Sequence, residues 1–250
     1  GGVSMAARLL WENIKPGCDP LSPDNPICLA NGLFAGTPVP VGGKYGLASK
    51  SPLTGFMGDS LSGSWFPVAL KRTGWDAVVI HGASEEWVNV FIDDDRVMFR
   101  DARKLVGLNT YETEEAIREE LLDDQVRSAT IGPGGENLVR FANVTNDGRQ
   151  AGRTGHGAVW GSKKLKAVSV RGTKGVVVAD PDTLMKMSFD ITQQAQGPYT
   201  VKYRVLGTTT NVLNMNKLGL LPTRNFQQGV FEMAEQVSGE YLEEHHKVKK

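Results

Sequence analysis

A glycine-rich stretch from Asn146 to Gly161, with the sequence NDGRQAGRTGHGAVWG, places the strongest constraint on the fold of this chain. Five glycines fall within it, and Arg149 and Arg153 lie between them. Glycine lets backbone N–H groups approach a ligand closely, and such groups bind phosphate oxygens together with arginine forks. The stretch therefore predicts a loop that holds a phosphate-bearing ligand. The alternative interpretation is a mobile glycine linker with solvated basic residues.

The charge around this stretch is positive, although the chain as a whole is neutral. Seven basic residues and no acidic residue lie between Gly148 and Lys174, whereas the whole chain has 28 Lys and Arg against 28 Asp and Glu. A neutral chain gives no general case for binding nucleic acid or a membrane surface. The local positive field therefore indicates a small anionic ligand.

Cysteine spacing and hydropathy indicate the compartment. Cys18 and Cys28 have the spacing of neither a redox pair nor a zinc site, so we interpret them as buried thiols in a reducing environment. No run approaches the roughly 18 apolar residues of a membrane span, and no basic and apolar leader opens the chain. These features favour a cytoplasmic protein without a membrane anchor.

Hydrophobic periodicity predicts an α+β fold for residues 1–178. Helical spacing occurs in residues 5–14 and 65–71, and Asn109 with Glu112 can cap a third helix. Apolar or alternating runs predict strands at 27–30, 77–80, 88–92, 97–99, 138–144 and 165–170. Glycine-rich loops are expected at 32–43, 54–64, 132–135 and 148–161. Several such loops converging on one ligand would suit a large cofactor, and neither GxGxxG nor GxxxxGK[ST] is present.

Residues 179–250 predict the beginning of a helical domain. Asp180 and Pro181 form an N-cap and N1 pair ahead of a helical apolar pattern. Further helices are expected over 209–218, stopped by Gly219, and from about Ser238. Because the chain starts without Met and ends in a charged segment, we expect it to be a piece of a longer protein.

The sequence predicts no catalytic side chain. His156 in the glycine stretch could move protons beside a cofactor, but a histidine packed inside the loop is the preferred interpretation. The three consecutive aspartates from Asp93 to Asp95 predict a solvated hairpin turn rather than a metal site. No histidine has a cysteine or carboxylate at ligand spacing, and the nucleophile motif GxSxG is missing.

Five motifs in this order give the chain a family resemblance. They are DPLSPDN at 19–25, SPLTG at 51–55, IGPxGENL at 131–138, NDG at 146–148 and AGRxGxGAVxGSKxLKA at 151–167. Together they resemble the aldehyde:ferredoxin oxidoreductase family, the tungsten (sometimes molybdenum) bis-pterin enzymes. The similarity runs from Gly1 to about Phe226, which is far more specific than any single glycine motif.

The resemblance implies an α+β base domain of two intertwined β-rich repeats that carries two pterin dithiolenes. Sulfur atoms of the pterins would hold the metal, so no protein side chain need ligate tungsten. A magnesium ion would bridge the two pterin phosphates, partly through backbone carbonyls such as those of Leu61 and Ala151. The family's [4Fe–4S] cluster would be bound by cysteines beyond Lys250.

The resemblance also implies a set of cofactor-binding positions: Lys44, Leu61, Gly63, Gln150, Ala151, Gly152 and Arg153. Lys44 stands where the family has a phosphate-binding Arg, which keeps the charge but loses the bidentate fork. Leu61 replaces a family Asn, so only its backbone carbonyl could take part. The alignment leaves open whether Arg149 or Gln150 replaces a second family Arg.

The implied activity is the oxidation of an aldehyde to a carboxylic acid, with ferredoxin as electron acceptor. Two alternatives remain open, namely a low-potential reductase component acting on aromatic acyl-thioesters and a non-catalytic pterin-binding or assembly protein. The implied partners are ferredoxin and a small aldehyde, and the resemblance is compatible with a homodimer. The metal and the substrate are not determined by these residues.

Overall fold

The computed structural model describes residues 1–246, and the chain divides into two compact units. Unit 1 comprises Gly1–Leu184 and unit 2 begins at Met185, so the division falls inside a helix. The expected domain boundary between residues 178 and 179 lies just ahead of this helix and stays a prediction. The last four residues of the predicted helical domain, 247–250, lie outside the described residues.

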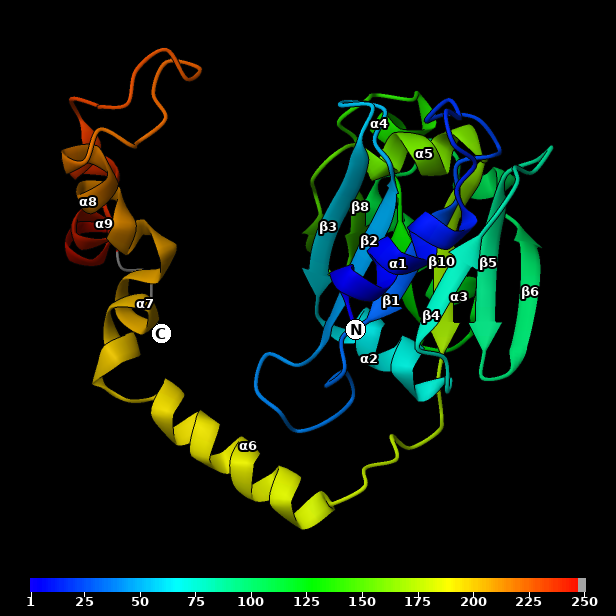
Figure 1. The fold of residues 1–250 in the computed structure, drawn as a ribbon, viewed down its shortest axis with the longest axis horizontal. Coiled ribbons are helices and arrows are strands. Elements are labelled where there is room, and N and C mark those ends of the chain that lie inside the picture. Colours follow the sequence, from blue (N-terminus) through cyan, green and yellow to red (C-terminus); the bar gives the residue numbers. More distant parts are fainter. Residues whose placement is uncertain (247–250) are drawn as a thin grey trace. The chain divides into compact units, whose positions relative to one another are not determined.

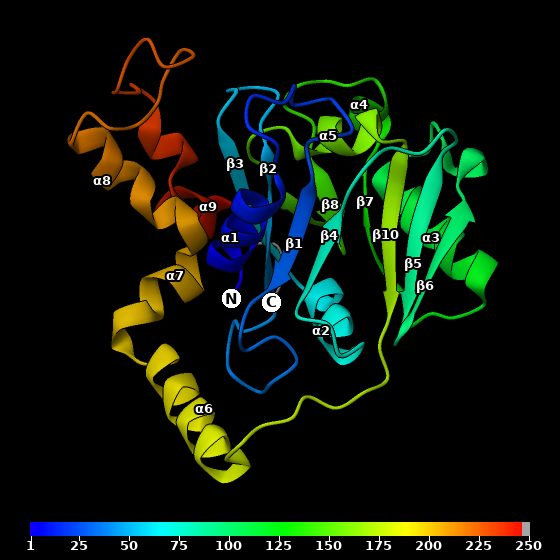
Figure 2. The same ribbon diagram turned by 45° about the vertical axis from the view of Figure 1, so that its right-hand side comes forward.

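Unit 1 contains two β-sheets packed face to face (Figures 1 and 2). The four-stranded sheet is antiparallel, with the order β3-β2-β1-β4. The six-stranded sheet has the order β6-β5-β10-β7-β8-β9, and only its β5–β10 pair is parallel. The strands are β1 Ile27–Asn31, β2 Lys44–Lys50, β3 Met57–Gly63, β4 Ala77–Ile80, β5 Val88–Asp93, β6 Arg96–Asp101, β7 Arg127–Thr130, β8 Val144–Asn146, β9 Arg149–Ala151 and β10 Leu165–Arg171.

Helices cover the outer faces of both sheets. The helices of unit 1 are α1 Val3–Asn13, α2 Trp65–Arg72, the 3-10 turn η1 Arg103–Leu105, α3 Thr110–Leu121, α4 Pro133–Glu136 and α5 His156–Ser162. Helix α1 buries Ala6 and Leu10 against the four-stranded sheet, and α3 buries Ile117 against the six-stranded sheet. The main core lies between the sheets, where Tyr45 and Trp160 are fully buried. The α+β class predicted from the sequence is confirmed.

Two glycines bring α4 and α5 into backbone contact. A Cβ added at Gly161 in α5 would stand 1.9 Å from the carbonyl oxygen of Gly135, and one at Gly135 in α4 would stand 2.9 Å from the carbonyl oxygen of Gly157. Since backbone atoms cannot move aside as a flexible side chain can, these positions exclude any side chain. These two glycines therefore serve close packing of two short helices.

Most helices and strands predicted from periodicity are confirmed. The capping box of α3 is present, because the Asn109 side chain accepts from Glu112 N at 3.0 Å and Glu112 Oε2 accepts from Asn109 N at 2.9 Å. Asp180 Oδ1 accepts from Thr183 N at 3.0 Å at the start of the helix that begins at Pro181. The hairpin with the turn at residues 93–95 is β5–β6.

Four predictions for unit 1 are wrong. Residues 138–143 form turns rather than a strand, since Val139 N donates to Gly134 O at 2.9 Å and the strand begins only at Val144. The expected loop at 54–64 is mostly strand β3, which escaped detection because it buries Ser60 and Ser62 and exposes Leu61. The expected loop at 132–135 is mostly helix α4, and the expected loop at 148–161 contains β9 and most of α5. Strand β2 was not predicted.

Unit 2 is helical in its described part. Its elements are the larger part of α6 Pro181–Ala195, then η2 Pro198–Thr200, α7 Val201–Leu206, η3 Gly207–Asn211, α8 Val212–Lys217, η4 Ala234–Val237 and α9 Gly239–His245. The helix expected over 209–218 is divided between η3 and α8, and Gly219 follows with φ 69°. Within residues 1–246, no helix has the length and apolar character needed to cross a membrane.

Gly161→Ala tests the α4–α5 contact. The added methyl group would meet the Gly135 carbonyl, so we expect a loss of about 3 kcal/mol or more in the free energy of unfolding. Gly134→Ala in α4 is the matched control, because its nearest atom lies 3.9 Å away. Urea unfolding followed by tryptophan fluorescence measures both variants. Equal midpoints for the two variants would contradict the proposed contact.

Candidate functional site

The edge strands of the two sheets lie beside each other in unit 1. Strand β3 ends the four-stranded sheet, β9 ends the six-stranded sheet, and the two are in contact. Arg153 N, just after β9, donates to Ser60 Oγ at 3.2 Å, and Asn146 Nδ2 donates to the Gly63 carbonyl at 2.7 Å. We call this contact, formed by residues 57–63 and 146–153, the β3–β9 seam.

A buried carboxamide holds one end of the seam. Asn146 is fully buried, and its Oδ1 accepts from Ser62 Oγ at 2.8 Å and from Tyr45 OH at 3.1 Å. Burial raises the pKa of Tyr45, so its hydroxyl stays protonated and donates. With the bond to Gly63, one side chain joins β8 to β2 and β3 through three hydrogen bonds.

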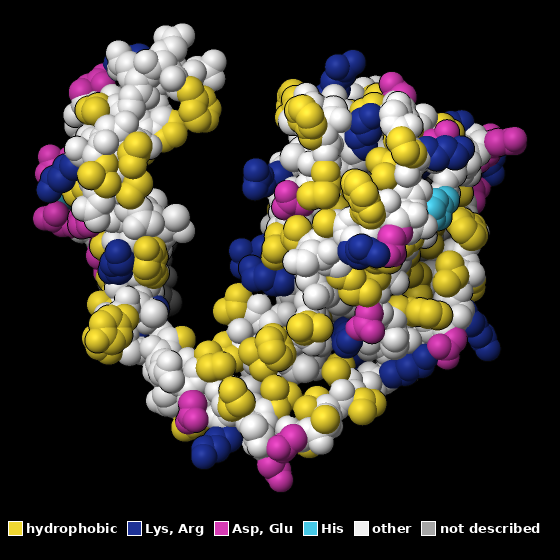
Figure 3. Space-filling view, in the orientation of Figure 1, with side chains coloured by type: hydrophobic (Ala, Val, Ile, Leu, Met, Phe, Trp, Pro, Cys, Tyr) yellow, Lys and Arg dark blue, Asp and Glu magenta, His cyan; other side chains and the backbone are white. Residues whose placement is uncertain are grey.

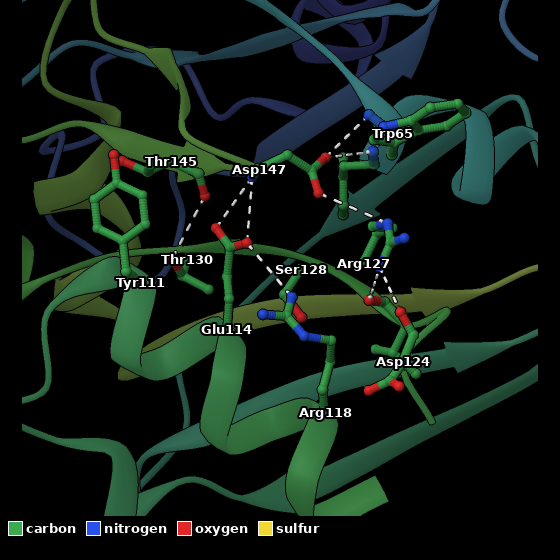
Figure 4. A network of polar contacts seen from close by, with 12 residues as sticks. Trp65, Tyr111, Glu114, Arg118, Asp124, Arg127, Ser128, Thr130, Thr145 and Asp147 are labelled. Carbon is green, nitrogen blue, oxygen red and sulfur yellow. Dashed lines mark hydrogen bonds and ion pairs between the residues drawn. The ribbon is translucent and has the colours of Figure 1, made fainter. Parts of the chain in front are cut away.

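The next residue, Asp147, connects the seam to two helices (Figure 4). Its Oδ2 accepts from the backbone N–H groups of Trp65 and Phe66 at 3.0 and 2.9 Å, which satisfies the N-terminus of α2. Its own N–H donates to Glu114 Oε1 on α3 at 3.1 Å. Burial, followed by the charge of Asp147, raises the pKa of Glu114 to about 7.

A pocket of about 520 Å³ opens at this end of the seam. Lys44 on β2, Gly63 on β3, Trp65 on α2 and Arg149 on β9 line it, together with Val41, Gly43, Ser64 and Val68. Lys44 and Gly63 are direct cross-strand partners, and a Cβ at Gly63 would stand 3.0 Å from the Gly43 carbonyl. Two positively charged side chains therefore share a pocket whose floor is glycine backbone.

Most of the basic side chains in and after the glycine stretch bind other groups of the protein. Of its seven basic residues, five bind carboxylates or carbonyls: Lys163 to Pro23 and Gly82, Lys164 to Glu85, Lys166 to Glu136 and Leu108, Arg171 to Asp123, and Lys174 to Asp95. Within residues 1–246, the side chains of Arg149 and Arg153 have no such partner, and the same holds for Lys44. Lys and Arg side chains are visible beside β3 on the surface of unit 1 (Figure 3). Among residues 1–246, these three are the cations beside strands β3 and β9 that have no internal partner.

The predicted residues occupy different positions at the seam. Arg149 and Gln150 are neighbours on β9 and point to opposite sides of the strand. Arg149 lines the pocket with Lys44, whereas the Gln150 amide lies 2.6 Å from that of Asn143 and does not line it. Ala151 is buried, and Gly152 and Arg153 are exposed immediately after it. Leu61 exposes 48% of its surface on β3 and offers no side-chain ligand.

His156 is a packed histidine. It is fully buried, its Nδ1 lies 2.8 Å from Ser49 Oγ and its Nε2 lies 3.1 Å from Thr154 Oγ1. Burial lowers its pKa to about 4, so the ring is neutral near pH 7. In the described part of the chain, no three His, Cys, Asp or Glu side chains are grouped so as to hold a metal ion.

Sequence reasoning missed Glu114 and the tie between Asp147 and α2. A signal for Glu114 was available, because it lies three residues before Ile117 and so on the buried face of α3. A carboxylate on the apolar face of an amphipathic helix indicates a buried polar contact. The tie between Asp147 and α2 joins residues 81 or 82 positions apart in the chain, and no local pattern predicts it.

Glu114→Gln tests the buried acid. Because the pKa of Glu114 is higher in the folded chain than in the unfolded chain, its contribution to stability is full below pH 4.5 and is lost as the pH rises towards 7. Glutamine keeps the acceptor for Asp147 N without this loss. We expect the variant to gain about 1–3 kcal/mol over the original chain between pH 5 and pH 8.

Urea unfolding at both pH values measures this difference in the free energy of unfolding. Glu115→Gln, at an exposed position on the same helix, is the control and should show no such gain. A Glu114→Gln curve parallel to that of the original chain at both pH values would argue against a buried, destabilising carboxylate.

Comparison with known proteins adds independent information on the family. A sequence model of the aldehyde ferredoxin oxidoreductase N-terminal domain matches residues 1–172, and one of domains 2 and 3 matches residues 186–250. The chain is 45% identical over 248 residues to the tungsten-containing aldehyde ferredoxin oxidoreductase of Thermococcus kodakarensis. The matched region covers 97% of this chain and 40% of that relative. The enzyme of the same name from Pyrococcus furiosus is 43% identical with the same coverage.

A solved structure is similar as well. The active site complex BamBC of Benzoyl Coenzyme A reductase, in complex with 1,5 Dienoyl-CoA, matches with a TM-score of 0.81 and 30% identity, covering 100% of this chain and 40% of that chain. The chain thus spans about two fifths of the length of these relatives. Both family models match in order, and the first alone spans more than half of the residues, so the chain belongs to the aldehyde ferredoxin oxidoreductase family.

Proposed function

We propose that this chain forms part of the cofactor site of a tungsten pterin oxidoreductase that oxidises aldehydes to carboxylic acids, with ferredoxin as electron acceptor. The observation that carries the proposal is a pair of cations, Lys44 and Arg149, that line one pocket beside the β3–β9 seam and have no internal partner within residues 1–246. Arg153 follows on the same seam, and its side chain has no internal partner among these residues either. Relatives that are 43–45% identical are named tungsten-containing aldehyde ferredoxin oxidoreductases, which supports the same activity for the protein that contains this chain.

The residues of the seam fit the phosphate end of a pterin cofactor. A pterin phosphate is anionic, and Lys44 and Arg149 line one pocket whose lining within residues 1–246 contains no carboxylate. The Arg149 guanidinium can donate two parallel hydrogen bonds to a phosphate, whereas Lys44 acts as a point charge. Gly43 and Gly63 keep the floor of the pocket free of side chains, so a phosphate can approach the backbone.

The division of roles follows from this fit. When bound, the pterin-held metal supplies the two-electron chemistry of the reaction. Lys44, Arg149 and Arg153 offset the phosphate charge, and Asp147 fixes the position of Trp65 on the pocket wall. Ala151 and Gly152 let the backbone of β9 come close to the cofactor, and Gln150 supports the loop through Asn143. Arg149 rather than Gln150 takes the place of the second family Arg.

Further parts of the proposal rest on the family alone. The backbone carbonyls of Leu61 and Ala151 would help to hold a magnesium ion beside the cofactor, and a [4Fe–4S] cluster would be bound outside this chain. Tungsten is favoured over molybdenum because the relatives are named for it. A cytoplasmic location and a homodimer belong to the same proposal.

A second candidate activity is the reduction of an aromatic acyl-thioester. It is favoured by the similarity to the BamBC complex, whose TM-score is 0.81 at 30% identity. The higher identity to the aldehyde enzymes places aldehyde oxidation first. A non-catalytic pterin-binding or assembly protein is the third candidate. Two assays of the purified full-length protein separate the three: one with an aldehyde and an oxidised electron carrier, and one with an aromatic acyl-thioester and a reduced low-potential carrier.

Arg149→Ala tests the phosphate site. Loss of a charge-assisted contact should cost about 1.5–3 kcal/mol of cofactor binding, which is about a 10- to 150-fold loss of affinity. Tungsten and pterin content per protein, measured after dialysis, give the result. Gln150→Ala on the same strand is the matched control and should keep normal occupancy. Normal occupancy in Arg149→Ala, or loss only in Gln150→Ala, would contradict this assignment.

A further inference from the structure

The turn between β8 and β9 determines where Arg149 stands. Asp147 and Gly148 have φ angles of 46° and 71°, and the residues on either side of them, Asn146 and Arg149, are direct cross-strand partners. Positive φ at both central residues is the geometry of a type I′ hairpin turn. Because Arg149 is the first residue after this turn, a change in the turn moves Arg149 relative to Lys44 on β2.

Helix α3 supports both central residues of the turn (Figure 4). Glu114 accepts a hydrogen bond from Asp147 N, with distances of 3.1 Å to Oε1 and 3.3 Å to Oε2. Tyr111, one helical turn earlier, lies 3.8 Å from the position that a Cβ would take at Gly148. On the other side, the Asp147 carboxylate accepts from the first N–H groups of α2. The turn is therefore fixed between two helices, and Glu114 supplies the hydrogen bond from α3.

Glu114 is buried without a close counter-ion. Its side chain is 7% exposed, and Arg118 Nη1 lies 3.9 Å from Oε2. Glu136 on α4, whose side chain is equally buried, is instead paired with Lys166 at 2.5 Å. Burial of a carboxyl group costs free energy that so long an ion pair does not offset, and the raised pKa of Glu114 reflects this cost. Within residues 1–246, the hydrogen-bond partner of this carboxyl group is Asp147 N, in the turn ahead of β9.

We propose that Glu114 is a positioning residue for the phosphate site: by holding Asp147 N, it keeps the turn in the conformation that places Arg149 in the pocket beside Lys44. Among residues 1–246, those that line this pocket do not include Glu114, so it acts through the turn and does not touch the ligand. The inference rests on the proposed function, in which Lys44 and Arg149 bind a pterin phosphate. The hydrogen bond itself joins two groups of unit 1 and needs no other part of the protein.

Two uncharged substitutions isolate the hydrogen-bond acceptor. Glu114→Gln keeps an oxygen that accepts from Asp147 N, whereas Glu114→Met keeps the length of the side chain without that oxygen. Because neither variant carries a charge at this position, a difference between them reports the hydrogen bond and not the electrostatics of the site. The rate is measured from the pterin and tungsten retained by the purified full-length holoprotein over time during dialysis at pH 7. We expect release about five- to ten-fold faster from Glu114→Met than from Glu114→Gln, since a displaced arginine binds its phosphate less well.

A double variant separates positioning from a general loss of stability. If Glu114 acts through Arg149, then Glu114→Met should add less than about two-fold to the release rate of Arg149→Ala, whereas independent effects would multiply. Ile117→Ala, one turn further along the buried face of α3, is the destabilised control. It should lower the midpoint of urea unfolding at least as much as Glu114→Met does, yet release pterin at the rate of the original protein.

The outcomes distinguish this inference from the proposed function. Equal release from Glu114→Met and Glu114→Gln, multiplied effects in the double variant, or fast release from Ile117→Ala would each overturn the positioning role and leave the phosphate site in place. Unchanged release from Arg149→Ala would overturn both, because Glu114 acts only through that residue.

Discussion

The carboxamide of Asn146 is the contact on which the arrangement of unit 1 depends. It is fully buried between two sheets, and all three of its hydrogen bonds go to the four-stranded sheet. A buried polar group stabilises a fold only while its partners stay in place, because an unsatisfied amide costs about 1–3 kcal/mol. Asn146 therefore fixes the register between the β8–β9 hairpin and strand β3. That register in turn determines which side chains reach the pocket.

The positive field predicted from the glycine stretch was correct in sign but too large in extent. Five of the seven basic residues serve the fold, and Lys166 does so from a fully buried position with Glu136. No sequence pattern separates these five residues from Arg149 and Arg153. Each of the five binds a partner that lies between 30 and 140 positions away in the chain. The motif order identified the family, whereas only the structure shows that Arg149 lines the pocket and Gln150 does not.

The fold was predictable where apolar residues alternate or repeat, as in α1, α3, β5, β6 and β10. It was not predictable for β3, because hydroxyl groups rather than apolar side chains occupy its buried face. Strand β8 and helix α5 were hidden for a related reason. Their burial depends on contacts such as that between His156 and Ser49, which are 107 positions apart. Glycine in α5 similarly reflects contact with a distant backbone rather than a mobile loop.

The tie between Asp147 and α2 has a consequence for ligand binding. Trp65 and Arg149 lie on different elements of unit 1, yet Asp147 sits two residues before Arg149 and accepts directly from Trp65 N. The backbones of two pocket walls are thereby held as one piece before any ligand arrives. An incoming anion then has to order only the ends of long side chains, which costs about 0.5–1.5 kcal/mol each. The conformational entropy of the backbone that forms the pocket walls has already been lost during folding.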